Sequence, residues 1–123
     1  MLPDNLKYTK DHEWVKINGD EITLGITDYA QGELGDIIFV ELPQIGEAFN
    51  KGDTIGTIEA VKTVADIYTP MDGEVVSINS EIEDAPELVN SDPFEKGWLI
   101  KIKSKDFSNA ELLNKEEYSA LIQ

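Results

Sequence analysis

Cysteine and arginine are absent from this sequence of 123 residues, and its only histidine is His12. Without cysteine the chain cannot form a disulfide, a zinc–thiolate site, an iron–sulfur cluster or a thiol nucleophile. A single histidine cannot make a metal cage by itself, so we expect no metal site. Any chemistry has to come from lysine, carboxylate, hydroxyl or backbone groups.

Positive charge is also scarce, because ten lysines stand against 25 carboxylates and the formal net charge is −15. A protein that binds nucleic acid needs a basic surface, so we expect no such partner. The longest apolar run, residues 37–40, is far shorter than the roughly 18 residues of a membrane span. Residues 1–5 carry no secretion or import pattern, so we expect a soluble, cytoplasmic protein with no membrane partner.

The apolar content is nevertheless high enough for a folded core. Hydrophobic residues make up 41% of the chain and include Trp14 and Trp98, which is enough to offset the entropy of ordering the chain. The length suits one domain, which we expect to span residues 1–123. Both tryptophans are expected to anchor the core and not to stack on a ligand.

Most of the chain has the pattern of short strands separated by turns. Residues 12–17 and 21–26 alternate between apolar and polar around Asn18-Gly19-Asp20, which predicts a hairpin. Residues 36–42 form a more continuous apolar run, typical of a strand buried on both faces. Further strands are predicted at 54–59, 63–68, 73–79 and 98–103, with a long polar loop at 80–97. Seven short strands favour a mainly β sandwich or flattened barrel.

Helical patterns are confined to two places. Thr27 is a candidate N-cap for a short helix near residues 28–34, which Gly35 would end. Within about 108–122, Ser108 and Asn114 are each followed three residues later by a glutamate, the spacing of a capping box. We therefore expect two short C-terminal helices. The residues expected to face inward are Leu112, Leu113, Tyr118, Leu121 and Ile122.

The most informative stretch is residues 56–68. Residues of high β propensity on both sides leave only Ala60 to Thr63 to reverse the chain, which places Lys62 at the tip of a tight hairpin. For an arbitrary lysine, the ordinary interpretation is a solvated turn residue.

Motifs in a fixed order along nearly the whole chain change that interpretation. They are Tyr8-Thr9-Lys10-Asp11-His12-Glu13-Trp14-Val15, Gly25-Ile26-Thr27-Asp28-Tyr29-Ala30-Gln31, Leu34-Gly35-Asp36, Val40-Glu41-Leu42-Pro43, Glu59-Ala60-Val61-Lys62, Pro70-Met71-Asp72-Gly73-Glu74-Val75, Pro86-Glu87-Leu88-Val89-Asn90, Asp92-Pro93-Phe94 and Gly97-Trp98-Leu99-Ile100-Lys101-Ile102. The hairpin resembles that of the biotinyl/lipoyl carrier domains, and the chain as a whole resembles the H-protein family of the glycine cleavage system.

The resemblance implies a barrel-sandwich hybrid fold with a lipoyl hairpin at about residues 54–68 and (R)-lipoate joined by an amide bond to Lys62. Glu59, Ala60, Val61 and Thr63 would present the lysine. The family usually has a serine before the Val-Lys pair and often an alanine after it, so Ala60 and Thr63 are small departures that a tight turn tolerates.

The resemblance also implies a function. The protein would be a monomeric, non-catalytic carrier whose arm takes the aminomethyl group of glycine from a pyridoxal-phosphate glycine decarboxylase. A tetrahydrofolate-dependent aminomethyltransferase would receive the one-carbon unit, and dihydrolipoamide dehydrogenase would reoxidise the arm. A lipoate ligase, or a lipoyl transferase or synthase, would supply the lipoyl group.

Three further residues match positions of interest in this family. Glu13 and Asp66 correspond to acids of the cleft that shields the loaded arm, where carboxylates would suit a cationic amine; the alternative is that they are ordinary surface carboxylates. His12 belongs to a His-Glu-Trp triplet, and we expect it to pack or form hydrogen bonds and not to donate protons.

Other functions are less consistent with the sequence. A biotin carrier would have methionine on both sides of the lysine, where Val61 and Thr63 stand here. The lipoyl domain of a 2-oxoacid dehydrogenase acyltransferase typically has aspartate before the lysine. An H-like relay that donates lipoate to 2-oxoacid dehydrogenase complexes would have the same sequence features, and an unmodified interaction module would have no need of Lys62.

Overall fold

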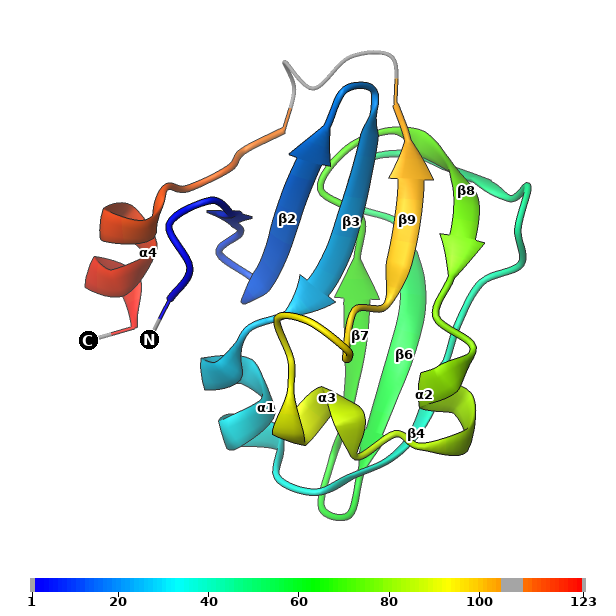
Figure 1. Cartoon of the computed structure of the whole chain (residues 1–123), viewed down its shortest axis with the longest axis vertical. Coiled ribbons are helices and arrows are strands. Elements are labelled where there is room, and N and C mark those ends of the chain that lie inside the picture. The colour runs from blue at the N-terminus through cyan, green and yellow to red at the C-terminus, as the bar shows by residue number, and fades with distance from the viewer. Residues whose placement is uncertain (1, 105–109, 123) are drawn as a thin grey trace.

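The strands of the computed structural model, which describes residues 2–104 and 110–122, form two antiparallel sheets (Figure 1). The larger sheet has the order β1-β2-β3-β9-β8-β5. Its strands are β1 (Lys7–Tyr8), β2 (Glu13–Asn18), β3 (Glu21–Ile26), β9 (Ile100–Lys103), β8 (Gly73–Ile78) and β5 (Ala48–Phe49). The smaller sheet, in the order β4-β6-β7, consists of β4 (Ile37–Glu41), β6 (Thr54–Ala60) and β7 (Val64–Tyr68). Within the described ranges the two sheets do not close into one barrel, so the predicted mainly β sandwich is confirmed.

The hydrophobic core fills the space between the sheets. Strands β3 and β9 contribute Leu24 and Ile102, and β6 and β7 contribute Ile58 and Ile67, all of them fully or almost fully buried. Burial of such side chains contributes roughly 1.5–3 kcal/mol each. The core therefore fixes the small sheet, and with it the predicted hairpin, against the large one.

The predicted hairpin at the N-terminus is present as β2 and β3. Trp14 faces Gly25 across the pair, and a methyl group at Gly25 would lie 2.4 Å from the indole ring. Glycine is needed here because the tryptophan occupies the space of a side chain. Trp14 is buried and donates a hydrogen bond from Nε1 to the carbonyl of Pro93 at 2.9 Å, so its prediction as a core anchor is confirmed. Trp98 is half-buried at the edge of the same cluster.

Four helices complete the part of the chain that the structure describes, namely α1 (Asp28–Leu34), α2 (Glu81–Asp84), α3 (Leu88–Ser91) and α4 (Lys115–Leu121). Thr27 caps α1 as predicted, because its side chain accepts a hydrogen bond from the amide of Ala30. The segment 80–97, predicted as a loop, contains α2 and α3, which bury Ile82 and Val89. None of the described helices exceeds seven residues, too few to cross a membrane.

The C-terminal segment differs in part from the prediction. Asn114 and Glu117 form the predicted capping box of α4, but Leu113 pairs with Tyr8 as an isolated bridge and residues 110–114 are not helical. The start of the first predicted helix, at Ser108 and Asn109, lies outside the described residues. Tyr118 is fully buried, as predicted. Leu121 is 49% exposed, so the predicted inward orientation of Leu121 is wrong.

Strand β4 also differs from its prediction as a strand buried on both faces. Ile37 and Val40 are buried, but Ile38 and Phe39 between them are 54% and 53% exposed. The register between β4 and β6 shifts between Ile37 and Phe39. Because a bulge interrupts the alternation of faces, it exposes two successive apolar residues.

Candidate functional site

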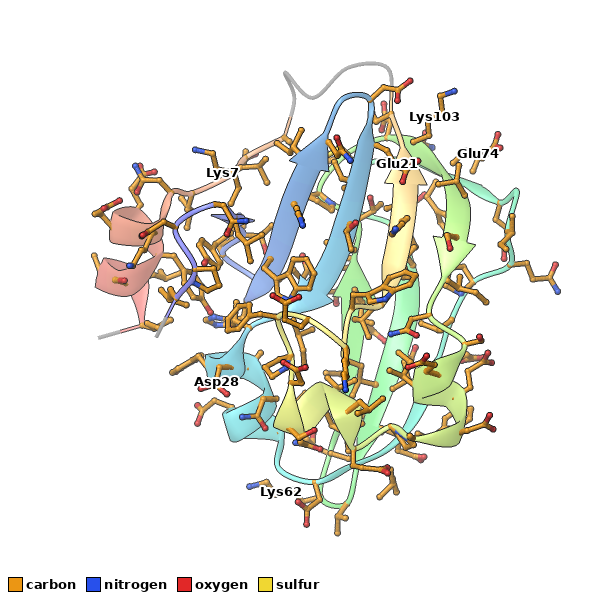
Figure 2. All side chains as sticks on the ribbon, viewed as in Figure 1. Lys7, Glu21, Asp28, Lys62, Glu74 and Lys103 are labelled. Carbon is orange, nitrogen blue, oxygen red and sulfur yellow. The ribbon has the colours of Figure 1, made fainter. Side chains whose placement is uncertain are left out.

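Lys62 lies at the tip of the hairpin formed by β6 and β7, in the position that the sequence predicts (Figure 2). The amide of Ala60 donates a hydrogen bond to the carbonyl of Thr63 at 2.8 Å, which closes the turn. The amide of Val61 donates to the carbonyl of Asp36 at 3.0 Å, which ties the turn to the chain before β4. The side chain of Lys62 is exposed. The tip is thus held by main-chain bonds and leaves its lysine accessible.

Gly35 shapes the space beside the lysine. Its φ of 81° favours glycine, and a methyl group there would lie 3.3 Å from Cε of Lys62. Gly35 also ends helix α1, since its amide donates to the carbonyl of Gln31. The residue that ends the helix therefore also lets the lysine side chain lie close to the backbone.

A cleft of about 260 Å³ lies between helix α1, the 9–13 turn and strands β6 and β7. Apolar side chains that line it include Ile26, Leu34, Ile58 and Ile67, and its carboxylate-bearing residues are Asp11, Glu13, Glu33 and Asp66. No lysine lines it among the residues that the structure describes. The cleft therefore combines an apolar lining with negative charge.

Glu13 lines the cleft and is only 2% exposed, and we call its buried position the inner end of the cleft. One carboxylate oxygen, Oε1, accepts a hydrogen bond from the hydroxyl of Thr9 at 3.0 Å, and Oε2 accepts one from the amide of Tyr68 at 2.9 Å. Burial raises the pKa of Glu13 to about 7, although these two hydrogen bonds oppose the shift. Glu13 is therefore not an ordinary surface carboxylate, and it can gain or lose a proton near neutral pH.

Asp66 has a different environment. It pairs with Thr57 in the small sheet and is exposed, between the half-buried Ala65 and the buried Ile67. It borders the cleft, but water screens its charge. The structure thus brings Glu13 and Asp66 to the same cleft and gives them unlike surroundings.

Tyr118 connects the two walls of the cleft, a role that the sequence did not reveal. Its hydroxyl lies 2.9 Å from Nδ1 of His12 in the 9–13 turn and 2.7 Å from Oγ1 of Thr27, the cap of α1. Burial raises the pKa of Tyr118, which keeps the phenol protonated. The ring of Tyr118 stacks on Tyr8 with centroids 4.9 Å apart. The C-terminal helix therefore fixes the turn that carries Glu13.

His12 has the role that the sequence predicts, as a packing and hydrogen-bonding residue. Besides its contact with Tyr118, its ring lies 4.9 Å from that of Tyr29 on α1. Its φ of 68° is the only positive one among the described non-glycine residues. A strained conformation of this kind needs support from its surroundings, which the bond to Tyr118 provides.

A second hollow has a volume of about 450 Å³. Lys10, Lys51 and Glu111 line it, and Lys51 pairs with Glu111 at 3.2 Å. It shares Asp11 and Glu13 with the cleft. The smaller cleft is the better candidate for the site, because helix α1 and the strands of the lysine hairpin form its walls.

Comparison with known proteins gives consistent results over nearly the whole chain. The family model for the glycine cleavage H-protein matches residues 6–123. The glycine cleavage system H proteins of Staphylococcus saprophyticus subsp. saprophyticus and Staphylococcus haemolyticus are each 52% identical over 122 residues, which cover 98% of this chain and 97% of each relative. The crystal structure of a glycine cleavage system H protein from Mycobacterium marinum superposes with a TM-score of 0.89 at 37% identity and covers 97% of both chains.

Proposed function

The chain belongs to the glycine cleavage H-protein family, and we propose that Lys62 is the residue on which it carries lipoate. Proteins of this family carry a lipoyl group and work with the enzymes of glycine cleavage. The chain is accordingly a lipoyl carrier that moves the aminomethyl group of glycine in that system.

The exposed position of Lys62 carries the proposal. A lysine that forms a Schiff base is desolvated to lower its pKa, whereas a lysine that another enzyme acylates has to protrude in a defined geometry. Lys62 is exposed, and main-chain hydrogen bonds at Ala60 and Val61 fix the turn beneath it. Attachment of (R)-lipoate through an amide bond would remove the positive charge and extend the side chain into a long arm.

The cleft beside the hairpin fits such an arm. Its apolar residues, among them Leu34, Ile58 and Ile67, suit an alkyl chain and exclude water. When attached, lipoate supplies a dithiolane that holds and releases the transferred group. Glu13 lies at the inner end, where a carboxylate would stabilise a cationic amine more strongly than in water. Asp66 would attract the same cation at the rim.

The chain's own residues perform no bond-breaking step in this proposal. The partners are a pyridoxal-phosphate glycine decarboxylase, a tetrahydrofolate-dependent aminomethyltransferase and dihydrolipoamide dehydrogenase, and a lipoate ligase or a lipoyl transferase or synthase provides the arm. A tether gives each enzyme a high local concentration of the carried group. The net charge of −15 favours partners with basic active-site rims and association that added salt slows.

Substitution of Lys62 by arginine tests the proposal. Arginine keeps the charge but does not accept the acyl group. Protein from cells supplied with lipoate should gain one lipoyl mass in the wild type and none in Lys62→Arg, and only the wild type should support glycine decarboxylation. Lys16→Arg, at an exposed position on β2, is the matched control and should be modified normally. Lipoyl mass on Lys62→Arg would refute the assignment.

A further inference from the structure

The edge strand β4 exposes two large apolar side chains next to the hairpin tip. Ile38 is 54% and Phe39 53% exposed, although buried residues flank them on both sides. Among the strands of residues 2–104 and 110–122, β4 pairs only with β6. Exposed apolar residues on an edge strand favour unwanted association unless a partner covers them.

The register connects these residues with the tip. Phe39 pairs with Glu59 on β6, and Glu59 pairs with Val64 on β7, so the three side chains follow one another across the sheet. Val64 is 61% and Val61 71% exposed. We call Ile38, Phe39, Val61 and Val64 the tip patch. The patch borders the hairpin tip, because Val61 precedes Lys62 in the turn and its amide is bonded to the carbonyl of Asp36, just before β4.

The charge around the tip patch is strongly one-sided. The strands on which it lies, β4, β6 and β7, contain three carboxylates, Glu41, Glu59 and Asp66, and no lysine. Figure 2 shows Lys62 at one end of the molecule and Lys103 at the opposite end. Asp36, Glu41 and Glu59 lie on or beside the strands of the patch. A partner that covers it needs an apolar recess with a basic rim.

We propose that the tip patch is the docking surface for the enzyme that attaches lipoate to Lys62, and this rests on the proposed function of Lys62. In that reaction Nζ attacks an activated lipoyl carbonyl. The N–C amide bond forms, the bond from the carbonyl to its adenylate or thioester leaving group breaks, and the nitrogen releases its proton to solvent. The active site of the attaching enzyme therefore has to enclose the tip itself. Enzymes that act on the dithiolane work at the far end of the arm and need not contact the patch.

Kinetics of attachment test the proposal. Unmodified protein is incubated with lipoate, ATP, magnesium and a lipoate ligase, and the initial rate of mass gain is measured at several protein concentrations. The double substitution Ile38→Thr with Phe39→Thr places a β-branched residue of high strand propensity at both positions. Its KM should rise at least tenfold with kcat within twofold of the wild type, because the patch acts in docking and not in chemistry. Added salt should raise the KM of both proteins.

Ile45→Thr is the matched control, because Ile45 is 63% exposed and lies outside the patch. Its KM should equal that of the wild type. If the double variant is unstable, Val64→Thr provides a second test of the patch, because the substitution is almost isosteric and lies at an exposed position. Its KM should rise severalfold.

Binding measured by calorimetry without ATP separates the docking surface from the modification site. In a Lys62→Arg background, the ligase should bind the chain, and the Ile38→Thr, Phe39→Thr pair should weaken this binding about tenfold. Equal affinity and equal KM in patch and control variants would overturn the docking surface while Lys62 stays the modified residue. Lack of lipoyl mass on Lys62 in the wild type would instead refute the proposed function.

Discussion

The hairpin tip and the inner end of the cleft are built in opposite ways. At the tip, Lys62 is exposed and the turn depends on two main-chain hydrogen bonds. At the inner end, Glu13 is 2% exposed, and its carboxylate accepts hydrogen bonds from nearby Thr9 and from the backbone of distant Tyr68. The hydroxyl of Tyr118 likewise bonds to the distant His12 and Thr27. The tip needs to be reached by partners, and the inner end needs to exclude water.

The difference shows how one small fold separates two tasks. It presents the lysine to partner enzymes at the tip, and it protects the carried group from water in the cleft. Because main-chain bonds close the turn, we expect modification of the lysine side chain to change the stability of the fold little. The inner end joins segments 55, 91 and 106 residues apart through Glu13, Thr27 and His12. Stability should therefore respond strongly to changes at the inner end and weakly to changes at the tip.

The largest effect is expected for Tyr118. Tyr118→Ala removes a fully buried aromatic ring and should lower the free energy of unfolding by about 3–5 kcal/mol. Tyr118→Phe keeps the stacking on Tyr8 but leaves Thr27 and His12 without their shared partner, which should cost about 1–3 kcal/mol. Urea denaturation measures both. Leu121→Ala, at a half-exposed position of the same helix, should cost much less; an equal loss there would mean that Tyr118 acts only as part of the helix.

The pH dependence of stability should reveal the raised pKa of Glu13 in the folded protein. Its folded-state pKa of about 7 lies above its ordinary value of 4.5, so the folded protein binds more protons between these values. The contribution of Glu13 to stability is therefore fully present below about pH 4.5 and is lost as the pH rises through 7. With 1.36 kcal/mol per pKa unit, the loss amounts to about 3 kcal/mol at most.

Glu13→Gln should flatten this part of the pH profile, because glutamine does not titrate. Unfolding curves across pH 4–9 give the free energy of unfolding of the wild type and of Glu13→Gln. The difference between the two values isolates Glu13, because repulsion among the other carboxylates is common to both proteins. Parallel profiles for the two proteins would show that folding leaves the pKa of Glu13 unchanged.

The contrast between the two regions also explains what could be predicted from the sequence. The turn at the tip closes between neighbouring residues, through the bond from Ala60 to Thr63, and β-forming flanks around it were enough to place Lys62. The cap at Thr27 and the hairpin at Gly19 are local in the same way. The burial of Glu13 and the bridge through Tyr118 depend on contacts between distant segments, which periodicity and capping patterns do not encode. The resemblance to the family pointed to Glu13 but not to its buried state.

Strand β4 shows a further limit. Its four successive apolar residues have the composition of a doubly buried strand, and that prediction was wrong because the register shift between Ile37 and Phe39 exposes two of them. The bulge depends on how β4 pairs with β6, and the composition of β4 does not indicate it. The exposed pair is also the feature from which we infer the docking surface.

A moderate effect is expected when the two cleft acids are compared in function. Because Glu13 is buried and Asp66 is exposed, a cation in the cleft should depend more on Glu13. Glu13→Gln should shorten the lifetime of the loaded carrier about tenfold, and Asp66→Asn by less than twofold at physiological salt. Glu33→Gln, at another exposed carboxylate of the cleft, is the control. Release of ammonia from purified loaded carrier gives the lifetimes, and equal decay in all four proteins would assign the acids no protective role.

The smallest effect is expected at the tip itself. Lys62→Arg should change the free energy of unfolding by no more than about 0.5 kcal/mol, the usual range for an exposed substitution. Lys62→Gln, which imitates the loss of charge on acylation, should lower stability slightly at low salt, because it makes a protein of net charge −15 more negative, and this difference should vanish at high salt as the charges are screened. Urea denaturation at two ionic strengths measures both variants.

The stability of Lys62→Gln tests whether the tip and the cleft are independent more directly than any change at the cleft does. If acylation of the tip left stability unchanged, the same fold would serve unmodified and modified forms, as a carrier that is loaded by a separate enzyme requires. A loss of 2 kcal/mol or more in Lys62→Gln at high salt would mean that the lysine side chain, which lies beside Gly35, helps to hold helix α1 against the hairpin. Attachment of the arm would then loosen the wall of the cleft, and the two regions would be coupled instead of independent.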